Sequence, residues 1–251
     1  MNDLDLLIDL HRDTWRQGPG GEAETRLAIG LSGLAGADGL KVADIGCGAG
    51  AASLLLAGAL EACVTAIDLV PAFLERARAG AVRAGLGHRI GTCAASMTAL
   101  PFGARSFDAI WSEGAIYNMG FQAGIGTWRH YLRPGGVLAV SELIWLTAAR
   151  PAVLERHWKA QYPEVDTAAA KLALLEANGY APLGFFVLPR RCWLENYYRP
   201  LEARFDSFLA RHGRSTGAQA LVAAEVAEIA LYERFADFYG YGYFVARKIG
   251  D

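Results

Sequence analysis

Residues 44–50 are Asp44-Ile45-Gly46-Cys47-Gly48-Ala49-Gly50, a run with glycine at every second position from 46 to 50. An apolar stretch at 40–45 leads into these glycines, and a helical pattern begins near Ala51. Because glycine has no Cβ, it lets the backbone turn sharply and approach a ligand closely. The run therefore predicts a short buried strand, a ligand-binding turn and a helix in succession.

Alternating strand and helix patterns continue along the chain from this turn. Pro71 opens one of the helices, at a position where its missing N–H costs nothing. Strands are predicted at 40–45, 62–67, 89–94, 107–112, 137–142, 183–188 and 241–248. Strands that alternate with helices pair in parallel through right-handed crossovers. We therefore expect an α/β fold with a doubly wound, mostly parallel seven-stranded sheet and helices on both faces.

The order of these patterns predicts a single domain over 1–251. Two helical patterns, separated by a Gly- and Pro-rich loop at 17–21, form a predicted N-terminal helical arm at 1–36. The predicted core follows at 37–192. Two further helical patterns at 193–240 separate the last two strands, which predicts a helical cap over the sheet. The last strand is predicted at 241–251.

Composition excludes several classes of protein. The net charge is −2 and the basic residues are scattered, whereas nucleic-acid binding needs a concentrated basic surface. The N-terminus is acidic, unlike a signal peptide, and no apolar stretch approaches the ~20 residues of a membrane span. The four cysteines and five histidines lack metal-ligand spacing. We expect a cytoplasmic protein with no nucleic-acid or membrane partner and no bound metal.

Two acidic residues narrow the choice of ligand. Asp68 lies 22 residues after Gly46, at the end of the second predicted strand, where a carboxylate can accept hydrogen bonds from the ribose hydroxyls of an adenosine. The glycine pattern alone also fits a nicotinamide dinucleotide. Asp44, just before the glycines, would repel a pyrophosphate but can hold an ammonium group. These residues favour S-adenosylmethionine, whose methionyl part carries such a group.

The sequence resembles the class I S-adenosylmethionine-dependent methyltransferases, and the matching motifs cover 40–142. The motifs are Val42 to Gly50, Ile67-Asp68, Leu100-Pro101-Phe102 with Ser106-Phe107-Asp108, and Leu132-Arg133-Pro134-Gly135-Gly136. The segments at 16–20, 111–118 and 193–198 look like a bacterial subgroup of small-molecule methyltransferases. The resemblance implies the Rossmann-like methyltransferase fold and S-adenosylmethionine as the cofactor.

The resemblance also implies which residues contact the cofactor. Gly46 and Gly48 would pass under the methionyl chain, Asp68 would hold the ribose, and Leu69 and Met97 would lie against the adenine. Ser96 stands where many relatives have an acidic residue, so a backbone group would make that adenine contact. The full predicted set is Gln17, Gly18, Gly20, Asp44, Gly46, Cys47, Gly48, Asp68, Leu69, Ser96, Met97, Glu113 and Gly114. Alternatively, Leu69 and Met97 are ordinary core residues, and 17–20 is a linker.

Methyl transfer from a sulfonium mainly requires that the acceptor be aligned with the methyl group. A base is needed only if the acceptor must lose a proton. Glu142, at the end of the fifth predicted strand, and His157 after it are the candidate catalytic residues. Aromatic side chains could stack on a ring or surround a cation. The predicted acceptor residues are Tyr117, Asn118, Trp145, Trp193, Tyr197 and Tyr198.

Alternatives remain open for these aromatic residues and for the function. Trp193, Tyr197 and Tyr198 would equally well pack the cap onto the sheet, and the aromatic run at 235–244 would form core or a homodimer contact. The leading hypothesis is methyl transfer to an O, N or C atom of a small molecule. A non-catalytic relative that only binds the cofactor is one alternative, and a nicotinamide-dependent oxidoreductase is another. Ser112-Glu113-Gly114-Ala115 lacks the Pro-Pro motif of amide- and base-methylating relatives, which disfavours a macromolecular acceptor.

Overall fold

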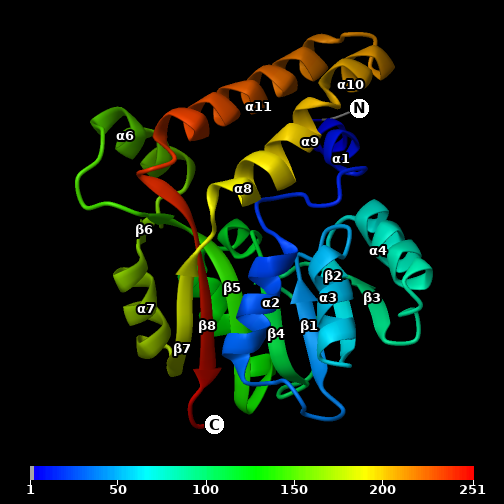
Figure 1. Cartoon of the computed structure of the whole chain (residues 1–251), viewed down its shortest axis with the longest axis vertical. Coiled ribbons are helices and arrows are strands. Elements are labelled where there is room, and N and C mark those ends of the chain that lie inside the picture. Colours follow the sequence, from blue (N-terminus) through cyan, green and yellow to red (C-terminus); the bar gives the residue numbers. More distant parts are fainter. Residues whose placement is uncertain (1–2) are drawn as a thin grey trace.

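The computed structural model describes residues 3–251; residues 1 and 2 of the predicted arm lie outside the described residues. A single twisted sheet runs through the molecule, with helices on both faces and a row of helices across one end (Figure 1). The strands are β1 (Lys41–Ile45), β2 (Cys63–Asp68), β3 (Ile90–Ala94), β4 (Phe107–Glu113), β5 (Leu132–Trp145), β6 (Asp166–Thr167), β7 (Tyr180–Val187) and β8 (Tyr239–Lys248).

The sheet has the order β3-β2-β1-β4-β5-β8-β7, and the short β6 pairs with β5 beside this path. Strands β1 to β5 are parallel, whereas β8 runs antiparallel to both β5 and β7. The predicted doubly wound, mostly parallel seven-stranded sheet is confirmed. Two elements were not predicted: β6, which has only two residues, and the helix that follows β5.

Helices cover both faces of the sheet and the end where the parallel strands finish (Figure 1). They are α1 (Asp3–His11), α2 (Glu22–Ser32), α3 (Ala51–Ala59), α4 (Pro71–Arg83), α5 (Phe121–Trp128), α6 (Ala152–Gln161), α7 (Ala168–Ala177), α8 (Arg190–Trp193), α9 (Arg199–Glu202), α10 (Phe205–Arg211) and α11 (Thr216–Phe235). Short 3-10 turns occupy Ile116–Asn118 and Arg129–Tyr131, and a π-helical turn occupies Leu194–Tyr198.

The core is divided between the two faces because side chains alternate along each strand. On β1, Val42 packs into a cluster with α2, α3 and α4, whereas its neighbour Ala43 packs into a second cluster with α5 and α7. Both residues are fully buried. Helix α2, which belongs to the predicted arm, contacts β7 and β8 and so forms part of the packed face.

The N-terminal helix and the cap meet above the carboxyl ends of the parallel strands. Helix α1 packs against α10 and α11, and its Leu6 and Leu10 are buried there (Figure 1). The first of the two helical patterns predicted at 193–240 is a series of shorter pieces, because a π-helical turn interrupts it and Pro200 lies in the first turn of α9. Helix α1 and the cap thus form one roof over the strand ends, although nearly the whole chain separates them in sequence.

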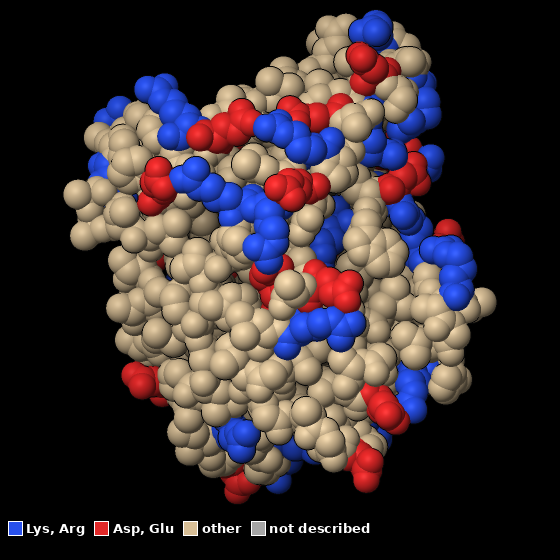
Figure 2. Space-filling view, in the orientation of Figure 1, with Lys and Arg blue, Asp and Glu red and all other residues tan. Residues whose placement is uncertain are grey.

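Acidic and basic side chains lie next to one another on the face shown in Figure 2. On the cap, Arg190 pairs with Asp237, and Arg199 pairs with both Glu202 and Glu233. Such exposed pairs contribute little to stability, because solvent screens them. Within residues 3–251, no helix has both the length and the apolar character that crossing a bilayer requires.

Candidate cofactor and acceptor site

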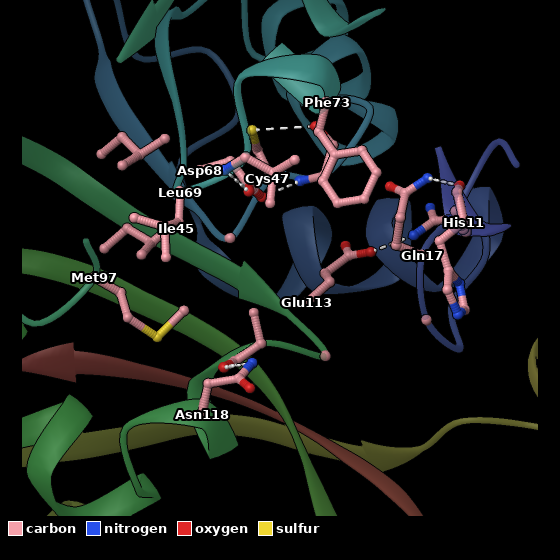
Figure 3. A pocket seen from close by; sticks show the side chains of 18 of the residues that line it. His11, Gln17, Ile45, Cys47, Asp68, Leu69, Phe73, Met97, Glu113 and Asn118 are labelled. Atoms are coloured by element: carbon pink, nitrogen blue, oxygen red, sulfur yellow. Dashed lines mark hydrogen bonds and ion pairs between the residues drawn. The ribbon is translucent and has the colours of Figure 1, made fainter. Parts of the chain in front are cut away.

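A cavity of about 600 Å³ lies between the carboxyl ends of β1, β2 and β4 and the roof formed by α1 and α11. This volume is in the range of small-molecule sites. Figure 3 shows Asp68, Leu69 and Met97 on one side and His11 and Gln17 on the other. The predicted site residues that line it are Gln17, Gly18, Asp44, Gly46, Cys47, Gly48, Asp68, Leu69, Ser96, Met97, Glu113, Gly114, Tyr117, Asn118 and Tyr197.

The glycine loop is held in place by β2. The N–H groups of Gly46 and Cys47 both donate to the carbonyl of Ile67, at 2.8 and 3.0 Å. Gly46 has φ +71° and Gly48 has φ +52°, which is the left-handed region that favours glycine. A Cβ on Gly46 would collide with the Cβ of Ala115, and one on Gly48 would collide with Gln17. The loop therefore needs glycine for both its conformation and its close packing.

Asp68 is oriented by backbone N–H groups on either side. Its Oδ2 accepts from Gly48 and its Oδ1 from Val70, each at 2.9 Å. A carboxylate oxygen has two lone pairs, so each oxygen keeps one acceptor position that can face the cavity. Burial raises the pKa of Asp68, although the two backbone bonds oppose this shift. The arrangement offers two fixed acceptors to a pair of vicinal hydroxyls.

Asp44 lies deeper, at the end of β1, and is only 1% exposed. Its Oδ2 accepts a hydrogen bond from the hydroxyl of Ser53 at 2.5 Å. Burial raises its pKa to about 7, and the nearby carboxylates of Glu113 and Asp68 also raise it. A cation beside Asp44 would relieve this unfavourable environment, whereas a pyrophosphate would worsen it.

The segment after α1 lies directly on the glycine loop. Gln17 Oε1 accepts from the N–H of Ala49 at 2.8 Å, while its Nε2 donates to the carbonyl of Thr14 at 3.0 Å. Gln17 therefore links the arm to the loop, and its contact with the cofactor stays a prediction. Gly20 is outside the cavity lining, and its carbonyl accepts from Asn196 of the cap.

Glu113 is the centre of a buried hydrogen-bond network. Its Oε2 pairs with Arg16 at 2.6 Å, and both side chains are less than a tenth exposed. Its Oε1 accepts from the hydroxyl groups of Thr25 and Tyr243 and from Trp111 Nε1, at 2.6, 2.9 and 3.2 Å. Glu113 thus ties the arm to β4 and β8 besides lining the cavity. Arg16 was not predicted as a site residue.

The expected adenine side of the cavity carries Leu69, Ser96 and Met97. Leu69 is 68% exposed, so the alternative in which it is a core residue is wrong. Met97 lines the cavity and also packs against the core beside α5. Ser96 Oγ lies 2.8 Å from the hydroxyl of Thr98. An apolar face beside exposed polar groups suits a heteroaromatic ring.

The two predicted catalytic residues lie outside the cavity lining. Ser141 accepts from the N–H of Gly114 at 2.8 Å, and the next residue, Glu142, points to the opposite face of β5. There Glu142 forms an ion pair at 3.2 Å with Lys171 of α7, and both side chains are fully buried. His157 lies on α6, against the ring of Trp158. Neither position supports a role at the strand ends.

Three of the predicted acceptor residues also lie outside the cavity lining. Trp145 ends β5 under the guanidinium of Arg150, at 4.3 Å from the ring centroid. Trp193 stacks on Tyr232, with centroids 4.5 Å apart, and is 3% exposed. Tyr198 donates to Glu228 at 3.0 Å. Trp193 and Tyr198 thus pack within the cap, which was the alternative interpretation of these two residues. Of the three predicted aromatic residues at 193–198, only Tyr197 lines the cavity.

Several cavity residues were missed by the sequence reasoning. They are Leu4, Leu7, Ile8, His11, Trp15 and Arg16 of the N-terminal arm and Glu225 and Glu228 of α11. The available signal was a polar residue on an otherwise buried helical stripe. His11 follows the apolar positions of α1, and it is 6% exposed; Glu225 is 8% exposed. In residues 3–251, no group of three or more His, Cys, Asp or Glu side chains is arranged to hold a metal ion.

Comparisons with known proteins agree with this geometry. Residues 42–136 match the family described as methyltransferase domain. The chain is 34% identical to 27-O-demethylrifamycin SV methyltransferase of Amycolatopsis mediterranei over 136 residues, 53% of this chain and 49% of that protein. It is 34% identical to erythromycin 3''-O-methyltransferase of Saccharopolyspora erythraea over 145 residues, 55% of this chain and 46% of that protein. The match thus spans about half the length of these curated relatives.

Solved structures extend the likeness to the whole fold. A methyltransferase from Geobacter sulfurreducens, in complex with S-adenosylhomocysteine, superposes with a TM-score of 0.82 at 18% identity, covering 96% of this chain and 97% of that chain. The [4+2]-cyclase SpnF superposes with a TM-score of 0.72 at 24% identity, covering 98% of this chain and 93% of that chain.

The strand order, the glycine loop and the acidic residue after β2 define a Rossmann-like protein with an adenosine-type site. The glycine loop and Asp68 lie within residues 42–136, which match the methyltransferase domain family, and the whole chain shares the fold of a methyltransferase solved with S-adenosylhomocysteine. The resemblance seen in the sequence is confirmed, and so is S-adenosylmethionine as the cofactor of this class of proteins.

Proposed function

We propose that the protein transfers a methyl group from S-adenosylmethionine to a hydroxyl group of a small, largely apolar molecule. The observation that carries this proposal is a single cavity with two unlike ends. Asp44 and Asp68 lie at one end, and Leu4, Leu7 and Tyr197 lie at the other. A donor and an acceptor bound in the same cavity can be brought into line, which is the main requirement for this reaction.

The residues of the first end fit the cofactor. Asp68 presents two fixed acceptors to the ribose, and the positive φ of Gly46 and Gly48 lets the loop backbone turn beside the cavity. Asp44 would hold the amino group, and the carboxylates around it favour a molecule with two positive charges. The bound cofactor supplies an electrophilic methyl group on a sulfonium. The same negative charges oppose a pyrophosphate, which argues against the nicotinamide alternative.

The residues of the second end suggest the acceptor class. Leu4, Leu7 and Ile8 present an apolar wall from α1, and Tyr117 and Asn118 supply polar groups beside the glycine loop. The named functions of the two curated relatives above are O-methylations of small molecules. We extend that chemistry to this chain because a hydroxyl group on an apolar scaffold suits such a pocket.

The test is methyl transfer by the purified protein. Titration calorimetry with S-adenosylhomocysteine comes first, and saturable binding is expected. A panel of hydroxylated aromatic and polyketide-like compounds is then incubated with S-adenosylmethionine, and mass spectrometry is expected to find a product heavier by one methylene. Binding without transfer to any hydroxyl, amine or carbon acceptor would support the non-catalytic alternative. Binding of NADH in place of S-adenosylhomocysteine would overturn the proposal.

A further inference from the structure

A histidine and a glutamate from opposite ends of the chain meet in the roof of the cavity. His11 is the last residue of α1 and Glu225 lies in the middle of α11, and both line the cavity. His11 Nε2 lies 3.3 Å from Glu225 Oε1. Both residues are more than nine-tenths buried. The pair is therefore held within the cavity wall and away from bulk solvent.

Each partner keeps one polar atom free. His11 Nδ1 and Glu225 Oε2 are buried and find no hydrogen-bond partner within residues 3–251. An unpaired buried polar atom is unfavourable, because it has lost its hydrogen bonds to water and gained none in the protein. A bound molecule that supplies a donor would satisfy them.

We propose that His11 is the general base that accepts the acceptor hydroxyl proton, and that Glu225 is the positioning residue that fixes its ring. With Nε2–H donating to Glu225, the neutral imidazole presents the lone pair of Nδ1. This inference rests on the proposed function. It assigns the acceptor end of the cavity to the wall formed by α1 and α11, near Tyr197.

The reaction balances with no other group. The acceptor hydroxyl oxygen forms a bond to the methyl carbon, and the bond between that carbon and the sulfur of S-adenosylmethionine breaks. The bonding pair stays on sulfur, which yields S-adenosylhomocysteine. The hydroxyl proton moves to His11 Nδ1, and the resulting imidazolium is stabilised by the Glu225 carboxylate. His11 later returns the proton to water.

Other groups near His11 are less suited to be the base. Glu228, one turn from Glu225, accepts a hydrogen bond from Tyr198 at 3.0 Å. Burial and the Glu225 charge raise the pKa of Glu228, while the Tyr198 bond and His11 lower it. The ring of Tyr197 stacks on His11, with centroids 6.1 Å apart, and holds the imidazole from one side. Among these three groups, only His11 has a ring nitrogen without a hydrogen-bond partner in the described part of the chain.

The experiment uses the full chain and the hydroxyl acceptor found in the panel. His11→Gln is expected to lower kcat at least about 100-fold, the usual range for loss of a general base. Its Kd for S-adenosylhomocysteine should stay within about threefold, because cofactor contacts lie at the other end. Glu225→Gln should lower kcat about tenfold with little change in KM, since the ring loses its orienting charge.

The chain offers a matched control. His212 directly follows α10, and its Nε2 lies 2.9 Å from Asp9 Oδ2 of α1. This pair is therefore a second histidine–carboxylate link between α1 and the cap. His212 is outside the cavity lining. His212→Gln should therefore keep kcat while removing a comparable tether, and circular dichroism would confirm that all three variants are folded.

Acceptor acidity separates a base from a structural residue. The loss in His11→Gln should shrink as the hydroxyl of the acceptor becomes more acidic, because proton removal then needs less assistance. Added imidazole should restore part of the activity. An equal loss for acidic and weakly acidic acceptors, without rescue, would overturn the assignment. If wild-type protein binds S-adenosylhomocysteine but transfers no methyl group, the proposed function has failed. If wild-type protein is active and His11→Gln is equally active, only this inference has failed.

Discussion

The two ends of the cavity are built in different ways. At the end with the glycine loop, contacts join segments that are close in sequence, such as Gly48 and Asp68, 20 residues apart. At the acceptor end, His11 and Glu225 are 214 residues apart. The first end uses backbone N–H groups in a glycine turn, and the second uses side chains of separate helices. The first can therefore be recognised from a motif, and the second only from the folded chain.

The largest effect is expected at a residue that belongs to neither end. Glu142→Leu would leave Lys171 buried without a partner, and such a change typically destabilises a protein by about 3–5 kcal/mol. Urea unfolding at pH 8 measures it. The cofactor Kd of the folded variant should be unchanged. Adding Lys171→Met to Glu142→Leu should recover most of the stability, and a double variant as unstable as the single one would contradict this account.

Asp68→Ala tests the cofactor end. The change removes the expected ribose acceptor and frees the N–H groups of Gly48 and Val70. Two charge-assisted hydrogen bonds correspond to roughly a 100-fold weaker Kd for S-adenosylhomocysteine. Asp108→Ala is the matched control, because Asp108 also accepts a backbone N–H, from Lys41, but is outside the cavity lining. Comparable losses in the two variants would refute a specific role for Asp68.

The pH dependence of cofactor binding tests Asp44. Burial raises its pKa to about 7 in the free protein, and it must be ionised to hold an ammonium group. Affinity should therefore fall about tenfold between pH 8 and pH 6, as the carboxylate takes up a proton. In Asp44→Asn the affinity should be low at both pH values. A wild-type Kd that is flat over this range would show that Asp44 does not face the cofactor.

The same carboxylate has an opposite effect on stability. A folded pKa above the unfolded value means that its favourable contribution is complete below about pH 4 and is lost as the pH rises through about 7. Asp44→Asn keeps an acceptor for Ser53 without the charge. It should raise the melting temperature of the ligand-free protein at pH 8 and change it little at pH 4. A lower melting temperature at pH 8 would refute burial as the dominant cause.

The smallest effect is expected where the two ends meet. Gln17→Ala removes the acceptor for the Ala49 N–H and the link from the arm to the loop. One neutral hydrogen bond is worth about 1 kcal/mol, so calorimetry should find the Kd about fivefold weaker. Gln17→Glu keeps the acceptor oxygen and should retain more affinity than Gln17→Ala. The reverse order would indicate that the charge, not the lost contact, dominates at this position.

The fold was predictable where the local pattern was regular. The seven main strands follow apolar runs between Gly and Pro signals, so their positions came from the sequence. The sequence did not predict the separate short helices of the cap, because the π-helical turn at Leu194–Tyr198 has no sequence pattern of its own. The two-residue β6 is too short to leave a pattern.

The candidate site divides in the same way. Asp44, the glycines and Asp68 were predictable because they lie at or just after the carboxyl end of a strand, which is the ligand-binding edge. Glu142 was predicted to end a strand, but β5 continues to Trp145, and Lys171 and Arg150 hold the two side chains away from the cavity. His11 and Glu225 have no shared motif, and only the packing of α1 on α11 brings them together.

A crystal structure with bound S-adenosylhomocysteine tests the central claim most directly, because it places both ends of the cavity around one molecule. The account predicts the ribose hydroxyls on Asp68, the amino group beside Asp44, and the sulfur facing the wall that holds His11 and Tyr197. A ligand with its ribose away from Asp68, or with its sulfur pointing away from that wall, would contradict the account.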